Sequence, residues 1–229
     1  MSDNATVPTH LEWPYDAVVI GASSGGIELL GLLLPSLPAG FPSAVLIVQH
    51  VRASPRPLSD LYAPRCAVPV CEAADKQPIV AGTVYLAPAD YHLLVESDRT
   101  CALSVDDPVQ HSRPSIDVLF ETAALTYRSR VLGILLSGAS SDGASGMAAI
   151  HEAGGTTWAQ LPSTARAATM PMSAISRGVV DEVLAPDDIV RRLAQCHAVN
   201  DLSDNNAAPH VSARAEAIEK STGADHRHE

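Results

Sequence analysis

The amino-acid sequence predicts an α/β fold: a doubly wound, mostly parallel sheet with helices on both faces and a small antiparallel hairpin. Three observations carry this prediction. Strand and helix patterns alternate along most of the chain, as they do in sheets covered by helices. Val131 to Leu136 is an unbroken apolar run, which is typical of a strand buried in the middle of a parallel sheet. Short strand patterns are so closely spaced between His92 and Val105 that we expect a hairpin there.

The first elements form a βαβ unit. Ala17 to Ile20 predicts a strand, Gly26 to Leu34 a helix and Ala44 to Val48 a second strand, with a turn rich in proline and glycine before the second strand. Five short elements follow, and the last two pair through a turn at Asp98-Arg99. They are a helix at Leu58 to Arg65 and strands at Val68 to Cys71, Thr83 to Ala87, His92 to Ser97 and Cys101 to Val105.

A helix signal opens the second half of the chain. Ser115 is a suitable N-cap, and Asp117 lies in the first turn, where a negative charge favours the helix dipole, so we expect a helix at Ile116 to Tyr127. Strands and helices then alternate to the end of the pattern. After the strand Val131 to Leu136 they are Ala144 to Glu152 (helix, closed by Gly154-Gly155), Thr156 to Ala159 (strand), Pro171 to Ser176 (helix), Val180 to Val183 (strand) and Asp187 to Cys196 (helix).

Composition limits the domain count and the partners. A chain of 229 residues that is 46% hydrophobic can bury one substantial core. We expect an N-terminal extension at 1–14, one domain at 15–198 and a disordered tail at 199–229, where the apolar period is lost. The formal net charge of −11 argues against nucleic acid as a partner. Because there is neither a long apolar run nor a signal-peptide pattern, we expect a cytoplasmic protein without membrane insertion.

The cysteines do not form a metal-binding pattern. Cys66 and Cys71 are separated by four residues, and neither a second pair nor a histidine cluster completes a zinc site. We therefore interpret these two cysteines, together with Cys101 and Cys196, as reduced packing residues, and we expect no metal and no cofactor.

The most informative segment follows the first strand. Gly21-Ala22-Ser23-Ser24-Gly25 fits the G-x-S-x-G nucleophile elbow, in which a sharp strand-to-helix turn exposes a serine hydroxyl that can attack a carbonyl. The helix after it directs free backbone N–H groups at the space above Ser23, where they would stabilise a developing oxyanion. The alternative is a phosphate cradle, but a dinucleotide fingerprint would need glycine in place of Ser23 and an acidic residue where the sequence has His50.

Ser23, His50 and Asp142 each follow a predicted strand. In a doubly wound sheet these positions share the carboxyl edge, so the three residues could serve as nucleophile, base and orienting carboxylate. Each also has a purely structural interpretation, Asp142 as a helix cap or turn residue and His50 as a packing or solvated side chain. The chain order Ser, His, Asp differs from the Ser, Asp, His order of α/β-hydrolases.

Together these residues resemble a known family, the catalytic domain of CheB-type protein-glutamate methylesterases. The resemblance runs in order from about residue 15 to about residue 195. It implies a seven-stranded, mostly parallel domain that hydrolyses glutamyl methyl esters on chemoreceptors and deamidates certain glutamines, with Ser23, His50 and Asp142 as the triad. The motifs that carry it are Val19 to Gly26, Val48 to His50, Tyr85 to Pro88, Arg113 to Phe120, Leu136 to Met147 and Met170-Pro171.

The sequence departs from the family pattern near the proposed triad. Ser24 replaces the usual Thr and keeps a hydroxyl, while Ala139 and Ser140 stand where Met and Gly are usual. Two further changes are Leu161 in place of Asp and Thr169 in place of Gly. We expect the oxyanion and substrate contacts to come from Ser24, Gly25, Ala139, Ser140, Arg113 and Met170.

The family's N-terminal receiver domain does not precede the first strand, so we expect a separate regulatory protein in its place. The expected protein partner is the methylated, glutamate-bearing helices of chemoreceptors or a similar methylated protein. An acidic enzyme needs local positive charge to approach them, for which Arg52, Arg56 and Arg113 are the candidates. A second hypothesis is a catalytically weak relative that binds a receptor or signalling partner, and a third is nucleotide binding at Gly21 to Gly26.

Overall fold

Parallel strands form the central sheet in the order β3-β4-β2-β1-β7-β8-β9. The computed structural model describes residues 13–51 and 56–196. β1 lies between β2 and β7, so the chain moves outward in both directions from the middle of the sheet, as the doubly wound prediction requires. The strands are β1 Ala17–Ala22, β2 Ala44–Gln49, β3 Val70–Glu72, β4 Val84–Leu86, β7 Val131–Leu135, β8 Thr156–Gln160 and β9 Glu182–Leu184.

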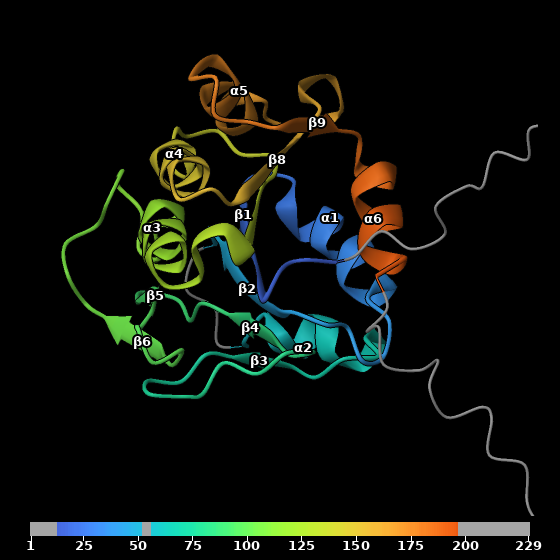
Figure 1. The fold of residues 1–229 in the computed structure, drawn as a ribbon, viewed down its shortest axis with the longest axis vertical. Helices are drawn as coiled ribbons and strands as arrows, with labels where there is room; N and C mark the ends of the chain where they lie inside the picture. The colour runs from blue at the N-terminus through green and yellow to red at the C-terminus, as the bar shows by residue number, and fades with distance from the viewer. Residues whose placement is uncertain (1–12, 52–55, 197–229) are drawn as a thin grey trace, which may run out of the picture. The chain divides into compact units, whose positions relative to one another are not determined.

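Helices cover both faces of this sheet, and its inner strands β1, β2, β4 and β7 are buried along their whole length. Val18 and Ile20 belong to the core that contains α1 and α6, whereas Ala17 and Val19 belong to the core that contains α3, α4 and α5. Figure 1 shows α1 and α6 on one side of the strands and α3 and α4 on the other. The helices are α1 Gly26–Leu33, α2 Ser59–Tyr62, α3 Ile116–Tyr127, α4 Ala144–Glu152, α5 Thr169–Ser176 and α6 Pro186–Ala194, with 3₁₀ turns η1 Leu34–Ser36, η2 Ala63–Arg65, η3 Arg128–Arg130 and η4 Pro162–Thr164.

The expected hairpin is confirmed. β5 (His92–Val95) and β6 (Cys101–Ser104) pair antiparallel and form a separate two-stranded sheet. The turn between them includes Asp98, whose carboxylate accepts hydrogen bonds from the backbone N–H and hydroxyl of Thr100. Arg99 has a φ of 63°, a conformation that a tight turn imposes. The parallel sheet with helices and the small antiparallel pair both match the fold class that the sequence predicts.

Element ends differ from the predictions by a few residues. β1 and β2 continue to Ala22 and Gln49 because both strands remain buried to their last residue. β9 begins at Glu182 instead of Val180. The reason is Asp181, whose carboxylate accepts a hydrogen bond from the backbone N–H of Thr157 at 2.8 Å and so takes the position of a strand carbonyl.

The chain divides into a unit of Met1–Ala198 and a unit of Val199–Glu229, and the described residues belong to the first. Most of the expected N-terminal extension and all of the tail at 199–229 lie outside the described residues, so these domain limits stay predictions. All four cysteines are free; Cys101 and Cys196 are buried, which raises the pKa of each thiol to about 12. Within the described ranges, no helix has both the length and the apolar character that crossing a membrane requires.

Candidate active site

Three neighbouring strands bring the predicted site residues to one edge of the sheet. Ser23 follows β1, His50 follows β2, and Asp142 lies in the loop between β7 and α4. Because β2, β1 and β7 are adjacent and parallel, their carboxyl ends meet at the point where the chain order reverses. The backbone N–H of His50 donates to the carbonyl of Ala22, and the N–H of Ser23 donates to the carbonyl of Ser137, both at 2.9 Å. The three loops are therefore hydrogen-bonded to one another directly beyond the strands.

Asp142 and His50 are in contact. The Nε2 atom of His50 lies 2.9 Å from Oδ2 of Asp142. The Asp142 side chain is fully buried, whereas that of His50 is 15% exposed. An ionised carboxylate can only accept hydrogen bonds, so Nε2 carries a proton and the lone pair of the neutral ring is on Nδ1. This tautomer leaves Nδ1 as the nitrogen that can accept a proton.

Asp142 also caps the neighbouring helix α3. Its carboxylate accepts hydrogen bonds from the backbone N–H groups of Ile116 at 2.8 Å and Asp117 at 2.9 Å. Ser115 occupies the expected N-cap position of α3, but its hydroxyl makes no cap bond and donates instead to Oδ1 of Asp142 at 2.8 Å. The prediction that Ser115 caps the helix is thus correct in position and wrong in chemistry, because a carboxylate from another loop supplies the cap.

The reverse contact caps α4. Asp117, in the first turn of α3, accepts hydrogen bonds from the backbone N–H groups of Gly143 at 2.9 Å and Gly146 at 2.8 Å. Asp142, which precedes α4, therefore caps α3, and Asp117, in the first turn of α3, caps α4. One carboxylate therefore caps a helix and contacts a histidine: the structural interpretation of Asp142 is confirmed, and its catalytic role stays a prediction.

The surroundings of the two aspartates shift their pKa values in opposite directions. Burial disfavours the charge of Asp142, but the hydrogen bonds from His50, Asp117, Ile116 and Ser115 outweigh burial and lower its pKa. Burial raises the pKa of Asp117, against the hydrogen bonds from Gly146 and Gly143, and the nearby charge of Asp142 raises it further. Asp142 is thus held as the carboxylate that His50 requires.

The turn that carries Ser23 depends on two glycines. Gly25 has a φ of 87°, which side chains rarely adopt, and a Cβ at Gly26 would lie 2.2 Å from Oε1 of Gln49. The Ser23 side chain is half-buried at the start of this turn. Among the described residues, no hydrogen bond joins its hydroxyl to His50, as is common in sites without a bound substrate.

Two residues that the sequence analysis did not single out hold this turn. The side-chain amide of Gln49 donates to the carbonyl of Ser23 at 2.8 Å and to that of His50 at 3.0 Å. The buried hydroxyl of Ser137 donates to the carbonyl of Ser24 at 2.6 Å and accepts from the backbone N–H of Ala167 at 2.9 Å. Both residues end or follow a strand beside a predicted site loop, and this position was the only sequence signal for them.

The Ser23 turn and the loop after β7 contain free backbone donors. In the described part of the chain, the backbone N–H groups of Ser24, Gly25, Ala139 and Ser140 have no hydrogen-bond acceptor. By contrast, the N–H of Gly138 donates to the carbonyl of Ala167 at 2.9 Å. A developing oxyanion could therefore bind the four unpaired donors but not Gly138.

Other predicted contacts have different surroundings. Met170 is fully buried and packs on Gly138, where a Cβ would lie 1.7 Å from the methionine sulfur, so Met170 supports the loop from below instead of facing open surface. Arg113 donates from Nη1 to the carbonyls of Val105 at 2.8 Å and Asp106 at 3.1 Å. Arg56 is exposed before α2. The candidate Arg52 lies outside the described residues.

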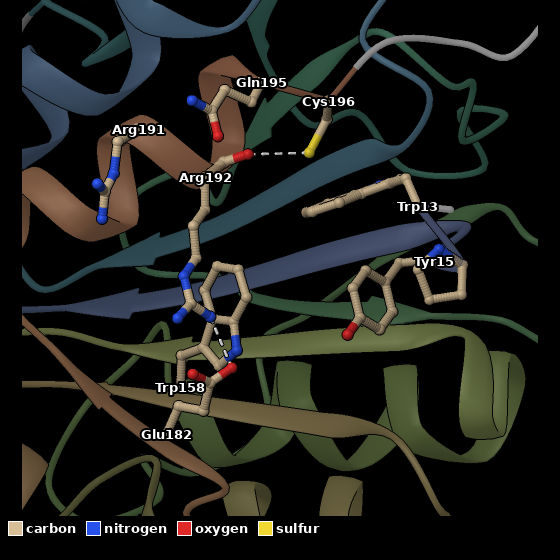
Figure 2. Close-up of a pocket in the computed structure, with 9 residues that line it drawn as sticks. Trp13, Tyr15, Trp158, Glu182, Arg191, Arg192, Gln195 and Cys196 are labelled. Carbon is tan, nitrogen blue, oxygen red and sulfur yellow. Dashed lines mark hydrogen bonds and ion pairs between the residues drawn. The ribbon is translucent and has the colours of Figure 1, made fainter. Parts of the chain in front are cut away.

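A cavity of about 510 Å³ lies away from this site (Figure 2). Figure 2 shows aromatic residues before and within the sheet, among them Tyr15 and Trp158, facing the end of α6. The guanidinium of Arg192 stacks over the Trp158 ring at 5.3 Å and pairs with the carboxylate of Glu182 at 2.6 Å. None of the residues lining this cavity belongs to the predicted triad, so its volume says nothing about the reaction. The described residues also contain no group of three or more His, Cys, Asp or Glu side chains that could hold a metal ion.

Replacing Asp142 by asparagine should lower the free energy of unfolding by about 3 kcal/mol at pH 7, because an amide cannot accept all four buried hydrogen bonds. Since the folded-state pKa of Asp142 is lowered, its stabilisation is present above the unfolded carboxyl pKa of about 4 and is lost as the pH falls further. Denaturant unfolding at several pH values should show that the difference in free energy of unfolding between wild type and Asp142→Asn becomes smaller below about pH 4. Asp188→Asn, at an exposed ion pair on α6, is the control; an equal loss in both variants would contradict the capping role.

Replacing Ser137 by alanine should lower the free energy of unfolding by about 1–3 kcal/mol, because the Ala167 N–H and the Ser24 carbonyl lose their shared hydrogen-bond partner. Movement of the Ser23 turn should also slow reaction of Ser23 with an activated serine-directed probe by about tenfold or more. Chemical denaturation and the labelling rate measure the two effects. Ser36→Ala removes a hydroxyl that also donates to a backbone carbonyl, but on η1, and should leave the labelling rate unchanged. A normal labelling rate in Ser137→Ala would show that the turn does not need this contact.

Comparison with known proteins identifies relatives over the same range. The family model described as CheB methylesterase matches residues 18–193. A relative from Leptospira interrogans serovar copenhageni, named for protein-glutamate methylesterase and protein-glutamine glutaminase activities, is 46% identical over 76% of this chain and 91% of its own length. A protein-glutamate methylesterase/protein-glutamine glutaminase from Symbiobacterium thermophilum is 39% identical over 75% of this chain, but this covers only 48% of the relative.

A solved structure agrees with these relatives. The CheB methylesterase catalytic domain of Thermotoga maritima superposes with a TM-score of 0.75 at 32% identity, covering 79% of this chain and 97% of that domain. The family model spans most of the chain, and the solved domain has the same overall fold. The chain therefore belongs to the CheB methylesterase family.

Proposed function

We propose that this chain hydrolyses the methyl esters of glutamate side chains in methylated proteins and releases methanol. The names of its relatives support this activity and add the deamidation of glutamine, which uses the same acyl chemistry. The observation that carries the proposal is the buried contact between Asp142 and Nε2 of His50, at the sheet edge where Ser23 begins a sharp turn.

The first half of the proposed reaction forms an acyl-enzyme. The Ser23 hydroxyl attacks the ester carbonyl carbon while Nδ1 of His50 removes its proton. The imidazolium that results carries a proton on each nitrogen, and the Asp142 carboxylate stabilises its charge through Nε2. Nδ1 then donates its proton to the departing methoxide, and methanol leaves.

The second half repeats the same steps with water. Nδ1 of His50 removes a proton from water, hydroxide attacks the acyl carbon, and the proton returns to Ser23 as the free glutamate forms. With a glutamine side chain, ammonia leaves in place of methanol, and the product is again glutamate. In both halves the unpaired N–H groups of Ser24, Gly25, Ala139 and Ser140 are the donors we assign to the oxyanion.

The departures in the loop after β7 do not remove these donors. Ala139 and Ser140 differ from the usual Met and Gly in their side chains, whereas an oxyanion hole uses backbone N–H groups. This consideration favours an active enzyme over the catalytically weak binding module, and the comparisons give no support to nucleotide binding. Covalent labelling of Ser23 separates the first two, because an intact triad labels and an inactive one does not.

The natural substrate we propose is the methylated cytoplasmic region of chemoreceptors, as the resemblance to CheB-type methylesterases implies. We also propose a cytoplasmic location for the enzyme, because the methylated region of this substrate is cytoplasmic. Purified methylated receptor is therefore the substrate of choice for the decisive assay.

Replacing Ser23 by alanine should lower methanol release from a methylated receptor by about 10⁴-fold or more, because no other group can form the acyl-enzyme. Thermal unfolding should be nearly unchanged, since the Ser23 side chain makes no hydrogen bond among the described residues. Gas chromatography of methanol and a melting curve measure the two quantities. Ser173→Ala, on the exposed face of α5, serves as the matched control and should keep wild-type turnover. Normal turnover in Ser23→Ala would remove the proposed nucleophile.

A further inference from the structure

An arginine that the sequence analysis did not consider lies against the nucleophile turn. A Cβ placed on Gly25 would lie 2.8 Å from Cβ and 3.4 Å from Cδ of Arg166, so the arginine side chain packs directly on this turn. The next residue, Ala167, donates its backbone N–H to Ser137 and accepts from Gly138. The network that holds the loops of the active site thus also fixes the backbone beside Arg166.

A hollow of about 350 Å³ opens beside this arginine and is continuous with the active-site loops. Gly25 and Ser137 line one end of it, and Leu29, Leu32 and Pro186 give it an apolar wall. Leu32 is 59% exposed, so its side chain is available for contact with a bound segment. Its polar lining comes from Glu28, Arg166, Gln160 and Thr164.

The guanidinium of Arg166 can exchange its present ion-pair partner, Glu28, for another carboxylate. Its Nη1 lies 3.5 Å from Oε1 of Glu28, and both side chains are about 70% exposed, at 70% and 69%. Exposed ion pairs of this kind contribute at most about 1 kcal/mol, so another carboxylate can replace Glu28 at little cost. Arg113, the cation expected from the sequence, is instead committed to the carbonyls of Val105 and Asp106.

We propose that Arg166 is a specificity-determining residue that pairs with a carboxylate of the substrate protein next to the methyl-esterified glutamate, while an apolar side chain of the same segment occupies the hollow. This inference rests on the proposed function. Every turnover leaves a glutamate carboxylate, so a segment with several such sites becomes more acidic as the reaction proceeds. An enzyme with a net charge of −11 repels that segment unless a local cation faces it. Glu28 then competes with the substrate for Arg166.

The test uses the full chain and two synthetic peptides that each contain one glutamyl methyl ester. In the acidic peptide the neighbouring polar positions are glutamate, and in the neutral peptide they are glutamine. The quantity measured is the preference, defined as kcat/KM for the acidic peptide divided by kcat/KM for the neutral one, from methanol release at low and high salt. Arg166→Gln should lower the preference about fivefold, mainly through KM, and should weaken its salt dependence.

Three further variants make the result specific. Arg166→Lys keeps the charge and should retain most of the preference, whereas Glu28→Gln removes the competitor and should raise it about two- to threefold. Arg191→Gln is the matched control, because Arg191 also forms an exposed ion pair with a neighbouring carboxylate but lies on α6, and it should leave the preference unchanged. Melting curves of all variants exclude unfolding as the cause.

The outcomes separate this inference from the function on which it rests. An unchanged preference in Arg166→Gln, or an equal fall in Arg191→Gln, overturns the role of Arg166 while Ser23-dependent methanol release still supports the esterase. Failure of the wild-type chain to release methanol from either peptide, or release that persists in Ser23→Ala, overturns the esterase and the inference with it.

Discussion

The buried Asp142 carboxylate is the interaction on which the rest of the site depends. A charge removed from water is costly unless enough donors surround it, and here an imidazole, a hydroxyl and two backbone N–H groups do so. Two of those donors are the backbone N–H groups of Ile116 and Asp117, which have no acceptor within α3 because they lie in its first turn. The cost of burying the charge is therefore offset by the cap that it provides, and of the other two contacts the one with His50 orients the imidazole. Asp117 in turn caps α4, so the same contacts that pack α3 against α4 also orient His50.

Backbone hydrogen bonds divide the active-site loops into fixed and available parts. Ser23 and Gly138 use their N–H groups to join the loops, and Gly26 closes the Ser23 turn by donating to the carbonyl of Ser23. The N–H groups of Ser24, Gly25, Ala139 and Ser140 are unpaired within the described residues. The fixed bonds, with the side chains of Gln49 and Ser137, hold the loops that carry the available donors. Preorganised donors of this kind are effective because they need no reorganisation as charge develops. Substitutions at 139 and 140 alter side chains on the rim and leave this division intact.

The net negative charge of the chain limits how it can bind an acidic substrate segment. An acidic chain must attract an acidic protein segment locally, since the field of the whole molecule opposes the approach. Arg113 is occupied by two backbone carbonyls of the fold itself. Within residues 13–51 and 56–196, Arg166 pairs with the exposed Glu28, and both side chains line a hollow to which Gly25 and Ser137 also contribute.

The sequence by itself determined the fold class and the order of the elements, because apolar periodicity and turn residues report locally on strands and helices. It also placed Ser23, His50 and Asp142 on one edge, since in a parallel sheet the residue after each strand lies at the carboxyl end. Element ends shifted where a side chain replaced a backbone partner, as Asp181 does beside β9. Only the tertiary structure decided that Asp142 and not Ser115 caps α3, that Met170 is buried beneath Gly138, and that Arg166 and not Arg113 faces the turn. These outcomes depend on contacts between residues far apart in the chain, for which no local pattern in one sequence carries a signal.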